Sequence, residues 1–145
     1  MAIVTDIADA VVAALDGETW SQEFTAERSY VPVWNQVDLA TLQVAVVPRT
    51  EVSQRESRVI SIHTYGVDIV IAKKMDDVTN AELDPYVTLA EEIADYWRDN
   101  HLLTLSGGVR AGCLAVQTEP VVASEILDEN RQFLSVVSLT FKVWR

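Results

Sequence analysis

The chain has 145 residues, 49% of them hydrophobic, and a formal net charge of −11 from 22 acidic and 11 basic residues. This length fits one domain, residues 1–145, with a sizeable core. The acidic balance disfavours binding to nucleic acid or to an anionic membrane, because both need clustered Lys and Arg. No apolar stretch approaches the roughly 20 residues that span a bilayer, and the N-terminus lacks a signal-peptide pattern, so we expect a soluble, cytosolic protein.

The first predicted element is an amphipathic helix over residues 4–17. Apolar residues recur there at helical spacing, namely Val4, Ile7, Ala8, Val11 and Leu15. Gly17 stands where such a helix would stop. A strand is predicted next, because Trp20, Gln22, Phe24 and Ala26 fall on alternate positions; Pro32 marks its end.

A short strand is predicted over residues 41–48, where Pro48 should end the pairing because it has no N–H to donate. A long strand follows over residues 58–73, and a bulge or bend near Gly66 would reconcile the faces of its two halves. The hydrophilic segment "PRTEVSQRES" between these strands offers little to bury. We expect it to form a protruding hairpin or loop.

The strongest helical pattern is "NAELDPYVTLAEEIADYWRDNH". Asp84 and Pro85 form one candidate start, and Thr79 with Glu82 forms an earlier one as a capping box. An apolar stripe is predicted to face the core, made of Tyr86, Leu89, Ala90, Ile93 and Trp97.

Two strands are predicted near the C-terminus, "VRAGCLAVQTEP" and "RQFLSVVSLTFKVWR". The last of them alternates between an apolar face that includes Phe133 and Phe141 and a mixed face, which is typical of a strand covered by helices on one side only. The order of elements predicts an α+β fold: an antiparallel or mixed sheet of four to five strands with two α-helices packed on it.

No motif in the sequence supports catalysis, so we predict that the protein is not an enzyme and holds no cofactor or metal. The two histidines, His63 and His101, are far apart and have no carboxylate at a ligand spacing. No Gly-x-Ser-x-Gly elbow occurs, and "SGGVRAG" lacks the Lys-Ser/Thr of a phosphate loop. Cys113 is the only cysteine, which excludes an intrachain disulfide; we expect a packed small hydrophobe.

Candidate residues for contacts between subunits lie in the polar hairpin and at exposed aromatic positions. Arginine and tryptophan are enriched in protein interfaces, and arginine suits pairing with carboxylates. A solvated loop of mixed charge is the simpler alternative for the hairpin. The candidates are Arg49, Arg55, Arg58, Trp34, Trp144 and Arg145.

The succession "LQVAVVPR", "SRVISIHTYGVDIVIAKKM", a Trp-containing helix and "EILDENRQFLSVVSLTFKVWR" resembles small neck proteins of tailed bacteriophages. The order and the residue patterns of these segments are similar to those of the tail terminator and tail-completion family, over about residues 42–145. The similarity includes no catalytic signature, and residues 19–36 are not matched.

This resemblance implies a structural virion protein that assembles in the host cytoplasm. It implies a homo-oligomeric, hexameric ring that ends the tail tube, joins it to the head connector or stopper protein, and lets DNA pass through its lumen without specific binding. No membrane partner is implied. Two alternatives remain open at this point: a head–tail stopper or adaptor, and an α+β domain that binds a small ligand.

Overall fold

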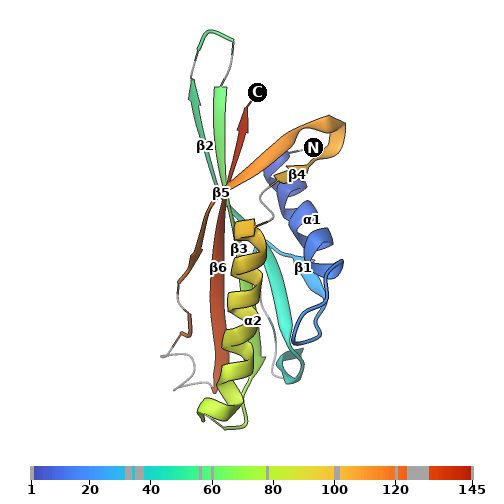
Figure 1. Ribbon diagram of the computed structural model, residues 1–145, viewed down its shortest axis with the longest axis vertical. Coiled ribbons are helices and arrows are strands. Elements are labelled where there is room, and N and C mark those ends of the chain that lie inside the picture. Colours follow the sequence, from blue (N-terminus) through green and yellow to red (C-terminus); the bar gives the residue numbers. More distant parts are fainter. Residues whose placement is uncertain are drawn as a thin grey trace.

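The computed structural model describes residues 2–31, 34, 38–55, 57–59, 61–77, 79–99, 102–119, 121–123 and 131–144. Two helices and six strands make up the fold (Figure 1). The helices are α1 (Ile3–Asp16) and α2 (Asn80–Asp99). The strands are β1 (Ala26–Arg28), β2 (Gln43–Arg55), β3 (Ser61–Lys74), β4 (Leu102–Thr104), β5 (Arg110–Thr118) and β6 (Gln132–Trp144).

The strands form one mixed sheet in the order β1-β2-β3-β6-β5-β4. Only β1 and β2 run parallel, and the other neighbours are antiparallel. The predicted α+β class is therefore confirmed, but the sheet has six strands instead of four to five. The strand that was not predicted is β4, which has only three residues. The first predicted strand is reduced to Ala26–Arg28, because the residues before it form a loop.

Both helices cover one face of the sheet, and β6 lies at its centre (Figure 1). Alternate β6 residues on this inner face have no solvent exposure, namely Phe133, Ser135, Val137, Leu139, Phe141 and Val143. The residues between them, from Leu134 to Lys142, are half-buried on the outer face. The predicted two-faced character of the last strand is confirmed, and the strand is fixed by β3 on one side and β5 on the other.

The first helix follows its predicted apolar pattern closely. Ile7, Ala8, Val11 and Leu15 are buried, and Gly17 ends the helix, its N–H donating to the Ala13 carbonyl over 3.0 Å. Together these four side chains form the stripe that packs α1 onto the sheet.

The second helix uses the earlier of its two predicted starts. The N–H of Glu82 donates to Thr79 Oγ1 over 3.4 Å, so Thr79 caps the first turn. The start at Asp84–Pro85 is therefore wrong, and Pro85 lies inside the helix. Of the predicted apolar stripe, four residues are buried and Tyr86 is half-buried.

Strand β2 continues past Pro48 to Arg55, so the prediction that pairing ends at this proline is wrong. The register shifts between Pro48, opposite Val67, and Thr50, opposite Gly66. The bulge that we predicted near Gly66 therefore lies opposite that residue, in β2, and not in β3. Proline is tolerated because β1 pairs with β2 only at residues 44–46, which leaves Pro48 at an open edge.

A polar cluster on the outer face of the sheet fixes this bulge. The extra residue, Arg49, crosses over β3 and its Nε lies 2.9 Å from Oδ1 of Asp68. The Ser138 hydroxyl donates to the same oxygen over 2.8 Å. Gly66 leaves room for this crossing, since a Cβ there would lie 2.4 Å from Thr50 Oγ1 and 3.0 Å from Arg49 Nη2.

We therefore expect Gly66→Ala to destabilise the protein by about 1–2 kcal/mol, because the added methyl displaces Thr50 and Arg49. At an uncrowded strand position the same change would stabilise by up to ~1 kcal/mol. Urea unfolding measures the difference. In a Thr50→Ala background the cost should fall, because the closest colliding atom is absent; an equal cost in both backgrounds would contradict this explanation.

Candidate functional site

The most exposed part of the fold is a hairpin, here called the arm, formed by residues 50–55, 57–59 and 61–64. It projects past both helices at one end of the longest axis (Figure 1). All β2 residues from Arg49 to Arg55 are exposed. Because successive strand residues point to opposite faces, neither face of β2 is covered here. The predicted protruding hairpin is confirmed.

The free edge of the arm is also open. On one side β2 pairs with β3 along the whole arm, from Thr50 opposite Gly66 to Arg55 opposite Ser61. On the other side its pairing with β1 stops at Val46, and no other described strand continues it. A long exposed edge with unpaired backbone groups is a template for pairing with another chain.

The structure groups only some of the predicted interface residues. Arg55 and Arg58 are exposed in the arm, and β6 brings the backbone of Trp144 to the same end, opposite Ile62. Arg49 lies at the base of the arm and is bound within its own chain. Arg145 lies outside the described residues.

Trp34 is separated from this group. It is half-buried and lines a small hollow of about 330 Å³ beside residues 43–45 of β2, at the other end of that strand from Arg55.

A second exposed feature is a larger hollow beside the loop that joins α1 to β1. Hydrogen bonds hold this loop: Trp20 Nε1 donates to the Leu15 carbonyl over 2.8 Å, and the Ala26 N–H donates to Asp16 Oδ1 over 2.9 Å. The Ser21 N–H donates to a Glu92 carboxylate over 3.2 Å, which ties the loop to α2.

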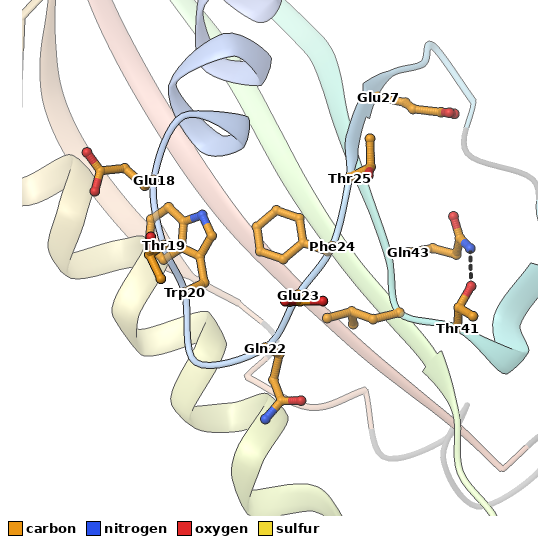
Figure 2. A pocket seen from close by; sticks show the side chains of 11 residues that line it. Glu18, Thr19, Trp20, Gln22, Glu23, Phe24, Thr25, Glu27, Thr41 and Gln43 are labelled. Atoms are coloured by element: carbon orange, nitrogen blue, oxygen red, sulfur yellow. Dashed lines mark hydrogen bonds between the residues drawn. The ribbon is translucent and has the colours of Figure 1, made fainter.

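This hollow, the loop hollow, has a volume of about 680 Å³. Figure 2 shows the rings of Trp20 and Phe24 side by side within it, with their centroids 6.1 Å apart. No Lys or Arg is among the described residues that line it, and the charged ones among these are all acidic. Its residues are Glu18, Thr19, Trp20, Gln22, Glu23, Phe24, Thr25, Glu27, Thr41, Leu42 and Gln43.

A row of aromatic rings connects the loop hollow to the core. Trp20 meets Tyr96 edge-on at 5.6 Å, Tyr96 meets Trp97 at 5.2 Å, and Trp97 meets Phe141 at 5.8 Å. Burial raises the pKa of Tyr96, and the nearby charge of Glu18 raises it further. The phenol therefore stays neutral at physiological pH, so the aromatic ring behind Trp20 carries no charge.

Sequence reasoning missed the loop hollow. The alternation of Trp20, Gln22, Phe24 and Ala26 predicted a strand, whereas residues 18–25 form a loop that closes on α2. The sequence does place three acidic residues around two aromatic ones in this segment. The hollow, however, also includes Leu42 and Gln43, which only the fold brings next to them.

The described residues do not assemble a metal site. Within them, no group of three or more His, Cys, Asp or Glu side chains could hold a metal ion. His63 Nδ1 lies 2.8 Å from the Ser53 hydroxyl in the arm, and His101 lies outside the described residues. No described helix is both long and apolar enough to cross a membrane.

Cys113 is expected to react slowly with alkylating reagents in the folded protein. Burial raises the pKa of its thiol, although hydrogen bonds with backbone groups of Ala115 and Thr140 oppose this shift. At a given pH less thiolate is therefore present than in the unfolded chain, and the thiolate is the reactive form. Iodoacetamide labelling followed by mass spectrometry, with and without urea, measures this; equal rates in both states would contradict it.

Neither a protein family model nor a curated protein matches this sequence. Solved structures do match. One is 12% identical, with an alignment that covers 97% of this chain and 92% of that chain and a TM-score of 0.53. At this identity the similarity concerns the fold of the whole domain and carries no information on function.

Proposed function

We propose that this protein is a structural protein of the neck of a tailed bacteriophage. In this proposal copies of the chain form a ring that ends the tail tube and joins it to the head connector. The ring has six copies in the family that the sequence resembles. The protein is not an enzyme in this role. Its partners are further copies of itself, the tail tube protein and the connector or stopper protein, and DNA crosses the lumen of the ring without specific contacts.

The observation that carries this proposal is the arm. The arm is exposed all along its β2 strand, whereas residues 61–64 of β3 are half-buried and β3 pairs with β6 up to Ile62. The open edge of the arm and its exposed Val52, 61% accessible, make it a liability in a protein that acts as a monomer. These features are expected of an element that is covered by a neighbouring subunit.

The rest of the domain also supports assembly. The apolar faces of both helices pack on the sheet, and the arm and the loop hollow lie on different parts of the surface. Contacts between two different surfaces of identical subunits generate a ring whenever the rotation closes. The sequence resemblance to neck proteins indicates which ring this would be, namely the one that ends the tail tube.

Light scattering of the purified protein over a range of concentration and salt tests the proposal. We expect a defined species of about six copies, visible as rings by electron microscopy. A monomer that persists at high concentration would contradict a ring-forming role. A head–tail stopper or adaptor would also form a ring; the side of a purified tail tube or connector to which the ring attaches distinguishes these roles.

A small-ligand-binding domain is the second candidate, and the loop hollow favours it. Its volume falls within the ~300–1,000 Å³ common for ligand pockets, and it combines two aromatic rings with carboxylates, which suits a cationic organic ligand. A thermal-shift screen of organic amines tests this function. A concentration-dependent rise in melting temperature that is lost in Trp20→Ala would support it.

A further inference from the structure

The tip of the arm, residues 55–59, carries two arginines and one glutamate in its sequence, together with an exposed apolar side chain. Val59 is 88% exposed, which makes it the most exposed large hydrophobic residue among those described. Arg58 precedes it, and Arg55 ends β2 just before the turn. Neither arginine forms an ion pair with a described residue, and both are exposed.

The loop hollow has the complementary properties. Trp20 and Phe24 offer an apolar surface inside it; Figure 2 shows Glu23 close to these rings and Glu18 and Glu27 at the two ends of the hollow. None of the described lining residues is basic. Exposed carboxylates beside aromatic rings suit arginine, which can pair with the former and stack on the latter.

We infer that the tip of the arm of one copy docks in the loop hollow of the next copy. In this contact Val59 meets the two rings, and Arg55 and Arg58 pair with the surrounding carboxylates. The inference rests on the proposed ring and names its subunit contact. The contact places the two arginines of the arm against carboxylates, although Glu51 and Glu56 leave residues 50–64 without a formal net charge.

A copy cannot fill its own hollow. Gln43 lines the hollow at the start of β2, and Arg55 lies twelve residues further along that strand. At a rise of about 3.3 Å per residue the two ends are about 40 Å apart. The contact is therefore between different copies and uses different surfaces on each, as a closed ring requires.

Two charge-reversed variants of the full chain test the contact. The arm variant is Arg55→Glu/Arg58→Glu, and the hollow variant is Glu23→Arg/Glu27→Arg. Each alone places like charges against each other at every contact, so we expect the apparent dissociation constant to rise about 100-fold by light scattering. Mixed in equal amounts, each arm meets a hollow of opposite charge, and assembly should return.

Matched controls carry the same charge changes elsewhere. Lys74→Glu/Arg98→Glu matches the arm variant, and Glu91→Arg/Asp99→Arg matches the hollow variant; all four positions are exposed and lie outside the arm and the hollow. The controls should assemble as the wild type does. Circular dichroism melting checks that every variant is folded.

The outcomes separate the docking contact from the ring itself. Recovery of assembly on mixing supports docking. If the wild type forms rings and both variants still do, or if both variants lose assembly and mixing does not restore it, the docking contact is wrong while the ring stands. If the wild type remains a monomer at every concentration, both the ring and this contact are overturned.

Discussion

Shortening the arm is expected to abolish self-association and leave a folded monomer. The change replaces residues 54–62 with Asn-Gly, a pair that favours the tight turn of a two-residue hairpin. It keeps Ser53 opposite His63, so the 2.8 Å contact between their side chains and the pairing of His63 with Val143 remain. The removed β2 residues are exposed, and the removed Ser61 and Ile62 of β3 are only half-buried, so little core area is lost.

Light scattering and thermal melting together measure this prediction. The melting temperature should change by no more than a few degrees, whereas the mass should fall to that of one chain. A matched control replaces only residues 57 and 58 with Gly and Ser, which removes Arg58 and keeps the length; we expect partial assembly. Rings formed by the shortened chain would exclude the arm as the main subunit contact.

Trp97→Ala is expected to lower the free energy of unfolding by about 3–5 kcal/mol, a large part of the total stability of a domain of this size. The side chain is 1% exposed and contacts Tyr96 and Phe141 edge-on. Its loss would open a cavity between α2 and β6 and break the aromatic row that supports the loop hollow.

Trp97→Phe should cost much less, on the order of 1 kcal/mol. The indole N–H of Trp97 is buried and has no acceptor among the described residues. An unsatisfied buried donor costs about 1–3 kcal/mol, and phenylalanine removes it while keeping most of the apolar surface. Urea unfolding of both variants measures the difference; equal losses would show that the N–H has an acceptor in solution.

The elements predicted correctly from the sequence are those with one buried face. In α1, α2 and β6 the apolar residues recur at the spacing of the buried positions, as Ile7 and Val11 do in α1 and Phe133 and Phe141 do in β6. Such spacing identifies an element without knowledge of its neighbours.

The elements missed or shortened lack that contrast. In the arm both faces of β2 are exposed, so this strand has no apolar alternation beyond Pro48, and its strand state depends on pairing with β3. The short edge strands β1 and β4 have three residues each and are defined by their neighbours. Local propensity is a weak guide where pairing decides the structure.

Only one of the two candidate contact surfaces could be predicted from the sequence. Composition placed Arg55 and Arg58 in a polar hairpin, because charged residues without apolar neighbours seldom enter a core. The loop hollow was not predictable, because bonds between distant residues shape it: Ser21 and Glu92 are separated by 71 positions.

The central place of β6 constrains the order in which the chain can fold during synthesis. When residues up to 123 have left the ribosome, β1, β2 and β3 can pair with one another and β4 can pair with β5, but these two groups share no strand contact. Residues 132–144 join them, and α2, which packs on β5 and β6, lacks one of these two strands until they arrive. Folding therefore waits on pairings between distant residues, which slows it and exposes the nascent chain to chaperones.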